Sequence, residues 1–372
     1  MRRAIVHIGL PRTGSTTLQE LLADLRPKLA ESGVCYPVIA PEGSEWSHVN
    51  HQPFGETLDG RRPRRERTEC LDVLSRRLAE TRADTVLLSY EDFSLQQRRF
   101  RVPDLLRSEL ARHGFRMEVL VVVKPQSEHL NSYYTHRAQL IREKRRFGEF
   151  ARAVWTSQRF DYDYLIEPWV EASGGRVVAI PMRDRRSDAP LLDRIFDGIG
   201  LGDQIGNLIG ASERATVKNR SSGPLAVEAS RRLRRMRVRE QARVPPREIG
   251  RFLDRFAEAR GWDPETFRGD DPVMMRRIDE RHAESNDRFG QTVWGRPWQD
   301  VVAYAPPRPP NELSTRVIDP EAESRVQTLV SAAIAHHGFK VRPGWWCAAV
   351  DLVETGVGRL LPAVGVQGWR VP

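Results

Sequence analysis

The sequence predicts an α/β protein built on a parallel β-sheet with helices on both faces. Apolar runs at 5–8, 85–89, 117–123 and 176–180 have the length and the β-branched composition of buried strands. Stretches with leucines at helical spacing lie between these runs. Parallel strands need a crossover connection, so this alternation of strands and helices is typical of a parallel sheet.

The first strand leads into a turn with the composition of an anion-binding loop. Gly9 and Pro11 end the apolar run, and Gly14 allows a tight turn. The hydroxyl-bearing residues 15–17 then begin a helix. Such a turn aims unpaired N–H groups and the positive end of a helix dipole at one point. The spacing of the two glycines matches ATP-binding loops, but Ser15 stands where those loops have lysine, which argues against an ordinary ATPase.

This loop resembles the 5′-phosphosulfate-binding loop of the sulfotransferases, whose usual form is P-[KR]-[ST]-G-[TS]-[TS]. In that family the loop holds the sulfate donor, 3′-phosphoadenosine 5′-phosphosulfate. The resemblance implies that Arg12 also stabilises charge during the transfer step. Because a strand followed by a glycine-rich helix start is also ordinary turn chemistry, a second motif is needed. The residues that the resemblance assigns to donor binding are Pro11, Arg12, Thr13, Gly14, Ser15, Thr16 and Thr17.

A second motif follows the apolar run at 117–123. Lys124 comes directly after this run, and Ser132 lies eight residues later in the next predicted helix. The pair resembles the 3′-phosphate-binding segment of the same family, where a basic residue and then a serine follow a strand. The family usually has arginine first; lysine keeps the charge but loses the bidentate fork. The two motifs together imply a P-loop-like three-layer sandwich and sulfotransferase activity.

The stretch between the first helix and the next strand contains the candidate base. Leucines at 18–29 predict that helix, and a polar loop follows a short extended piece at 33–37. In related sulfotransferases a His or Glu of this stretch takes the proton of the acceptor hydroxyl. The Asn50–His51 pair is similar to that position in bacterial members, so His51 is the first candidate. The alternatives in this loop are His48 and Glu45.

Two further features precede the second motif. Residues 56–67 are dense in arginine and predict a mobile basic loop, which either contacts an anionic acceptor or is simply solvated. The run at 85–89 ends at Ser89, and Ser89 with Glu91 is similar to a Ser-x-Glu of bacterial family members. Ligands of parallel sheets lie beyond the carboxyl ends of the strands, so both residues are expected near the site. Glu91 either orients the base, holds the acceptor or is itself the base, or it is simply a carboxylate at a helix start.

The second half of the chain is predicted to be mainly helical. Helices are expected from 125 to about 146 and at 150–171, 224–243, 249–290 and 325–338. Residues 217–222 resemble a family region whose basic loop closes over the donor, which makes Lys218 and Arg220 candidates, and residues 284–289 resemble a later family feature. We predict an α/β donor-binding core at 1–210, a helical part of the same domain at 211–305, and a Pro-rich linker with a helical, apolar tail at 306–372.

Composition restricts the partners. A formal net charge of +9 over 372 residues favours anionic ligands, such as a nucleotide donor or an acidic glycan. The sequence has no recognisable nucleic-acid-binding motif. Its three widely spaced cysteines suggest neither a disulfide framework nor a metal site, and no stretch has the length of a membrane span. We therefore expect a cytoplasmic bacterial enzyme without a metal or a nucleic-acid partner.

The predicted function is transfer of a sulfuryl group from 3′-phosphoadenosine 5′-phosphosulfate to a hydroxyl of a carbohydrate-like acceptor. Two alternatives belong to other classes. A nucleotide-dependent kinase with a divergent loop would bind ATP and depend on Mg²⁺. A non-catalytic homologue would bind the donor without transferring its sulfuryl group.

Overall fold

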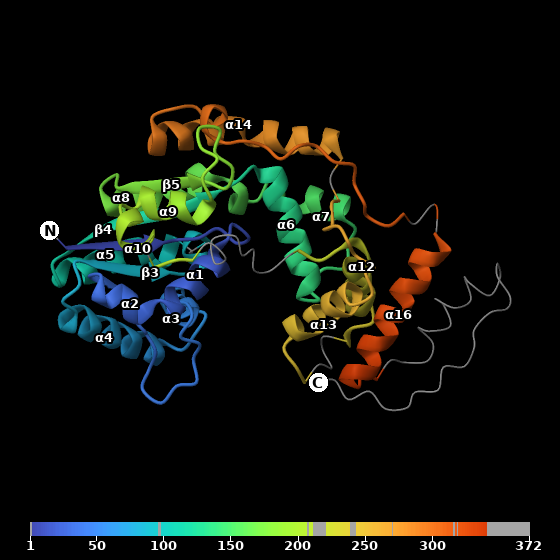
Figure 1. Cartoon of the computed structure of the whole chain (residues 1–372), viewed down its shortest axis with the longest axis horizontal. Coiled ribbons are helices and arrows are strands. Elements are labelled where there is room, and N and C mark those ends of the chain that lie inside the picture. The colour runs from blue at the N-terminus through green and yellow to red at the C-terminus, as the bar shows by residue number, and fades with distance from the viewer. Residues whose placement is uncertain are drawn as a thin grey trace. The chain divides into compact units, whose positions relative to one another are not determined.

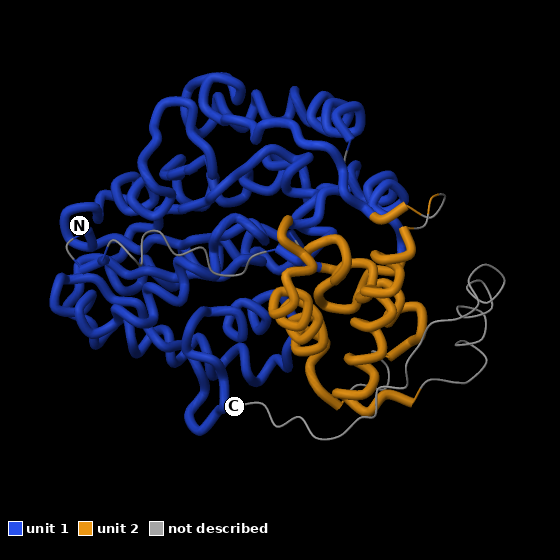
Figure 2. The backbone as a smooth tube through the Cα atoms, turned by 45° about the vertical axis from the view of Figure 1, so that its right-hand side comes forward, with its two compact units in different colours: residues 1–136, 145–222, 266–312 blue, residues 137–144, 223–265, 313–372 orange. Residues whose placement is uncertain are grey.

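The computed structural model describes residues 2–95, 98–206, 208–210, 221–238, 243–269, 271–314, 317 and 319–340. The chain divides into two compact units, coloured separately in Figure 2. Unit 1 comprises residues 1–136, 145–222 and 266–312, and unit 2 comprises residues 137–144, 223–265 and 313–372. The units thus alternate along the chain, whereas the partition into 1–210, 211–305 and 306–372 stays a prediction.

Unit 1 contains a five-stranded sheet in the order β2-β3-β1-β4-β5. Figure 1 labels β3, β4 and β5 of this sheet. All four pairs of neighbouring strands are parallel, which confirms the α/β class. After the central strand β1 the chain first adds β2 and β3 on one side and then β4 and β5 on the other. The order therefore reverses at β1, the point where parallel sheets bind ligands. The strands are β1 (Arg2–His7), β2 (Val34–Cys35), β3 (Thr85–Ser89), β4 (Phe115–Val123) and β5 (Val177–Pro181).

Helices cover both faces of this sheet, an arrangement compatible with three layers. Ala4 and Val6 of β1 belong to one core cluster and Ile5 to another, because successive side chains of a strand point to opposite faces. The first cluster includes α3 (Gln52–Leu58), α4 (Arg64–Glu80), α5 (Val102–Arg112), α8 (Tyr162–Ser173), α14 (Pro272–Trp294) and α15 (Trp298–Val301). The second includes α1 (Ser15–Asp24), α2 (Arg26–Glu31), α9 (Leu191–Gly198) and α10 (Gly202–Gly206).

Several predicted helices are shorter or divided. The leucines at 18–29 are divided between α1 and α2, with Leu25 at the junction, because Pro27 in the first turn of α2 favours a new helix start. The helix after Lys124 is α6 (Gln126–Gln139), which ends well before residue 146. The helix predicted at 150–171 is α7 (Phe147–Val154) followed by α8, with the short helix η3 (Gln158–Phe160) between them. Two more short helices are η1 (Glu91–Leu95) and η2 (Arg98–Phe100).

Unit 2 has a separate helical core. Leu225, Leu253 and Leu329 bring together α12 (Pro224–Arg235), α13 (Pro246–Glu258) and α16 (Pro320–His337). The single helix predicted at 249–290 is wrong, because the stretch is divided between α13 of unit 2 and α14 of unit 1. Residues 306–310 have no regular secondary structure, as expected, and the apolar tail lies outside the described residues. In the described part of the chain, no helix is long and apolar enough to cross a bilayer.

Candidate functional site

The loop between β1 and α1 has the backbone of an anion-binding turn. Gly9, Arg12 and Gly14 have positive φ angles of 67°, 73° and 87°. Reversals of backbone hand of this kind let successive N–H groups converge on a concave surface. Gly14 is exposed and forms the N-cap of α1, and no described side chain caps the helix. The first N–H groups of α1 are therefore available to an anion.

Gly9 is required because the chain after β3 lies against it. A Cβ atom at this position would be 2.4 Å from the Cα atom and 2.7 Å from the carbonyl oxygen of Glu91. The backbone N–H of Tyr90 also donates to the His7 carbonyl at 3.1 Å, which fixes this segment to the end of β1. Glu91 therefore lies beside the loop, at the carboxyl end of β3.

The second motif meets the first at Lys124. Its Nζ atom donates to the Arg12 carbonyl at 2.8 Å and to the Ser132 hydroxyl at 2.7 Å. The Ser132 hydroxyl can accept this bond because it donates its own proton to the Glu128 carbonyl at 2.9 Å. Lys124 follows β4 and Ser132 lies on α6, so one buried ammonium links both elements to the loop after β1.

The Lys124 ammonium is costly to bury. Lys124 is only 5% exposed, and its pKa is lowered to about 7, chiefly by desolvation. Repulsion by Arg12 and Arg183 contributes to this lowering, while Glu128, which is ion-paired with Arg183, acts in the opposite direction. A bound anion would favour the protonated form of Lys124, because its negative charge would attract the ammonium.

The side chains of the first motif divide into exposed and buried groups. Arg12 is half-buried and donates through Nη2 to the Ser221 hydroxyl at 2.9 Å. Thr16 and Thr17 are partly exposed on the first turn of α1. Arg12 and these two hydroxyl groups are therefore accessible at the loop surface.

The buried members hold the loop in shape. Pro11 is buried, and the Thr13 hydroxyl donates to the Leu10 carbonyl at 2.7 Å, which closes the turn internally. The Ser15 hydroxyl is buried and has no hydrogen-bond partner among the described residues. An unpartnered buried hydroxyl at a helix start is unusual, and it identifies a donor that none of the described residues uses.

His51 does not have the surroundings of a general base. Its Nδ1 accepts from the Ser89 backbone N–H at 3.0 Å, and its Nε2 donates to the Pro37 carbonyl at 2.8 Å. Both ring nitrogens are thus engaged with backbone groups, and no lone pair remains to take a proton. His51 is 3% exposed, and burial lowers its pKa to about 4. The structure therefore favours a role for His51 in joining the loop after β2 to β3, rather than the predicted catalytic role.

A buried polar chain near the loop escaped the sequence analysis. The His7 Nδ1 atom lies 2.7 Å from the Ser89 hydroxyl, to which the Gln19 amide donates at 3.0 Å. Asn50 donates to Gln19 in turn at 3.2 Å. The only sequence signal is that His7 and Gln19 occupy positions otherwise filled by apolar residues of the first strand and helix.

Acid should destabilise the protein partly through His51. Its pKa of about 4 in the folded state lies below the ordinary 6.5, so unfolding takes up a proton between these values. The stabilisation is complete above pH 6.5 and decreases as the pH falls towards 4, by about 3 kcal/mol in total. In denaturant titrations at pH 7 and pH 4.5, we expect His51→Gln to lose clearly less stability than wild type. An equal loss in both proteins would contradict a buried neutral His51.

The other two candidates in this loop are exposed. His48 and Glu45 both have solvent-accessible side chains, and the His48 carbonyl accepts from Arg26 at 2.6 Å. Among the described residues, no contact joins either side chain to the loop between β1 and α1. The structure therefore does not single out a base in this loop.

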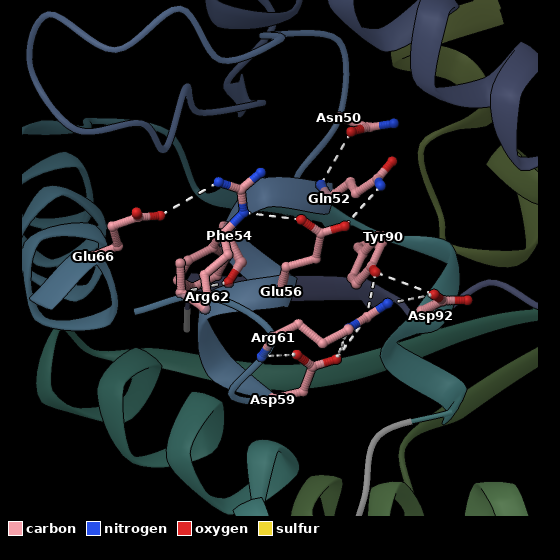
Figure 3. A network of polar contacts seen from close by, with 11 residues as sticks. Asn50, Gln52, Phe54, Glu56, Asp59, Arg61, Arg62, Glu66, Tyr90 and Asp92 are labelled. Carbon is pink, nitrogen blue, oxygen red and sulfur yellow. Dashed lines mark hydrogen bonds and ion pairs between the residues drawn. The ribbon is translucent and has the colours of Figure 1, made fainter. Parts of the chain in front are cut away.

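The predicted basic loop at 56–67 is largely ordered by carboxylates. It contains the end of α3 and the start of α4, so only residues 59–63 connect them. Arg61 contacts Asp59, Asp92 and the Tyr90 hydroxyl (Figure 3). The neighbouring Arg62 lies between Glu56 and Glu66. These ion pairs offset much of the positive charge that the sequence suggested for an acceptor.

Two groups of sequence candidates remain to be placed. Lys218 and Arg220 lie outside the described residues. Residues 284–289 belong to α14, and Asn286 of this stretch pairs with Gln126 at the start of α6.

Within the described ranges, no group of three or more His, Cys, Asp or Glu side chains is arranged to hold a metal ion. Comparisons with protein-family models, curated proteins and solved structures gave no match.

Proposed function

We propose that the protein is a sulfotransferase that uses 3′-phosphoadenosine 5′-phosphosulfate and a hydroxyl-bearing, carbohydrate-like acceptor. The observation that carries the proposal is the 2.8 Å hydrogen bond from Lys124 to the Arg12 carbonyl. It joins the two motifs that resemble the donor-binding segments of that family, although they are 112 residues apart in the sequence. The strand order, which reverses at β1, and the sequence resemblance support a P-loop-like fold.

The residues present suit a ligand with two separate phosphate groups. The loop after β1 offers backbone N–H groups, the Arg12 guanidinium and the Ser15 hydroxyl, which has no partner in the described part of the chain. The segment after β4 offers the buried Lys124 ammonium beside the Ser132 hydroxyl. In the proposed complex, the loop holds the 5′-phosphosulfate, and Lys124 holds the 3′-phosphate together with Ser132, whose hydroxyl then donates to the phosphate instead of the Glu128 carbonyl.

The donor would supply the sulfuryl group, and the protein would supply charge and position. As negative charge grows on the departing 5′-phosphate, Arg12 and the amides at the start of α1 stabilise it with donors that are already in place. The positive end of the α1 dipole acts in the same sense. The positive φ of 73° at Arg12 gives the loop the reversal of backbone hand that such anion-binding turns use.

Among the candidate bases, Glu91 has the position that best suits proton transfer. Its backbone contacts Gly9, and its side chain is partly exposed at the carboxyl end of β3, the strand next to β1. His51 has both ring nitrogens engaged, as described above. We therefore assign to Glu91 the acceptance of the proton from the acceptor hydroxyl.

The donor assignment is tested by titration calorimetry with 3′-phosphoadenosine 5′-phosphate, the product form of the donor. We expect tight binding to wild type and weak binding of ATP with Mg²⁺, because Ser15 replaces the lysine of ATP-binding loops. Replacing Arg12 with alanine should weaken bisphosphate binding at least ~tenfold by removing a charge-assisted hydrogen bond.

A matched control is Arg107→Ala, which removes an exposed guanidinium from α5. Its affinity should stay within about twofold of wild type, since screening makes distant surface charges nearly ineffective. A preference for ATP would favour the kinase alternative. Failure to bind the bisphosphate would reject the donor site, whereas binding without transfer to any hydroxyl acceptor would favour a non-catalytic homologue.

A further inference from the structure

The segment that contains Lys124 and Ser132 is fixed by hydrogen bonds to residues much later in the chain. α6 begins two residues after Lys124, so the position of its first turn decides where both side chains lie. Hydrogen bonds from α14 reach this turn, and a hydrogen bond from α8 reaches the Lys124 carbonyl just before it. The contacts given below all lie within unit 1.

The first support is a reciprocal pair of amides. Gln126 donates to the Asn286 side-chain oxygen at 2.6 Å, and Asn286 donates back to Gln126 at 2.9 Å. Gln126 is fully buried and Asn286 is 2% exposed. Two buried amides that satisfy each other define one geometry, because any shift of α6 against α14 leaves polar groups without partners.

The second support is a carboxylate at the start of α6. Asp279 accepts from the Ser127 backbone N–H at 3.2 Å and from the Ser127 hydroxyl at 2.9 Å. A carboxylate at a helix start satisfies a free N–H group and interacts favourably with the helix dipole. Since Asp279 belongs to α14, it holds α6 at the same end as the amide pair.

A third contact fixes the backbone of Lys124 itself. The Tyr162 hydroxyl of α8 donates to the Lys124 carbonyl at 2.9 Å, and the Tyr162 ring packs against Phe289 of α14. The main chain at Lys124 and the first turn of α6 therefore depend directly or indirectly on α14. Two of the supporting residues, Asn286 and Phe289, belong to the stretch 284–289. This stretch has no role in the proposed donor and acceptor chemistry.

We infer that Asn286 and Asp279 are positioning residues for the second phosphate group, acting through Gln126 and Ser127 to hold Lys124 and Ser132 in place. This inference rests on the proposed function, in which these two side chains bind the 3′-phosphate. It adds that α14 sets the discrimination between a bisphosphate and a monophosphate nucleotide. Neither Asn286 nor Asp279 contacts the ligand in this scheme.

The test compares the affinities for 3′-phosphoadenosine 5′-phosphate and adenosine 5′-phosphate in wild type, Asn286→Ala and Asp279→Asn. We expect both variants to lose at least ~tenfold in affinity for the bisphosphate and less than ~threefold for the monophosphate. The ratio of the two affinities is the informative quantity, because a general loss of stability would lower both alike. Asp279 is only half-buried, so its variant provides the measurement if Asn286→Ala fails to fold.

The matched control is Glu284→Gln on the same helix. Glu284 pairs with Arg288, four residues later on α14, and its side chain is 91% exposed. We expect this variant to keep the wild-type affinity ratio even where its stability falls. If wild type binds the bisphosphate and both test variants keep the wild-type ratio of the two affinities, the inference is overturned while the proposed function stands. No bisphosphate binding by the wild type would overturn the proposed function and the inference together.

Discussion

Replacing Lys124 with methionine is expected to lower the affinity for 3′-phosphoadenosine 5′-phosphate at least ~100-fold, because a buried charge-assisted hydrogen bond to phosphate is lost. The same change should raise stability at pH 6. Burial lowers the pKa of Lys124 from 10.5 to about 7, so the folded state holds the protonated side chain at a cost of roughly 5 kcal/mol below pH 7. Methionine fills a similar volume without that cost. Calorimetry and denaturant titration measure the two effects separately.

The stability difference between Lys124→Met and wild type should depend on pH in a defined direction. Between about pH 7 and 10.5 the unfolded chain binds more protons at Lys124 than the folded chain, so wild-type stability rises with pH in this window. The stability advantage of Lys124→Met should therefore shrink as the pH rises from 7. Lys28→Met removes the same charge from an exposed position of α2 and should alter neither property. If Lys124→Met binds the bisphosphate as wild type does, Lys124 has no role in the site.

Gly9→Ala should cause the largest loss of stability of any single methyl addition in the loop. The new Cβ atom would lie 2.4 Å from a backbone atom of Glu91, in a backbone conformation with φ of +67°. Because the obstacle is main chain fixed to β1, it cannot rotate away as a side chain would. We expect a loss of at least ~3 kcal/mol in the free energy of unfolding, or no folding. Denaturant unfolding of the variant and wild type under identical conditions provides the measurement.

Gly33→Ala separates the steric effect from the conformational one. Gly33 also has a positive φ of +76°, but a Cβ atom there would meet nothing within 4 Å. Only the left-handed backbone is then penalised, at about 1 kcal/mol. The difference between the two variants measures the clash between Gly9 and Glu91. Equal losses at both positions would mean that Glu91 does not lie against the loop.

Many of the backbone elements that position the candidate site were predictable from the sequence. The runs at 85–89 and 117–123 are strands, and Lys124 follows the second one directly. Gly9 and Gly14 indicated a tight turn, and both have positive φ angles. Such features depend on a few neighbouring residues, because apolar spacing and glycine conformations are set by the local backbone.

The chemical state of the site residues required the tertiary structure. His51 is a plausible base in the sequence, yet the backbone groups of Pro37 and Ser89 engage both of its nitrogens. The arginines at 61 and 62 looked like a free basic loop, yet carboxylates from α3, α4 and η1 contact them. Whether a side chain can accept a proton or bind an anion depends on its burial and on its partners.

The sequence by itself determined the α/β class, the parallel strands and the place of the loop after β1, because these follow from local patterns of apolar residues and glycines. Only the tertiary structure decided that Lys124 contacts the Arg12 backbone and that α14 supports the start of α6. The reason is physical, because these hydrogen bonds join residues more than 100 positions apart in the sequence. Local spacing of residue types does not specify which distant groups meet when the chain folds.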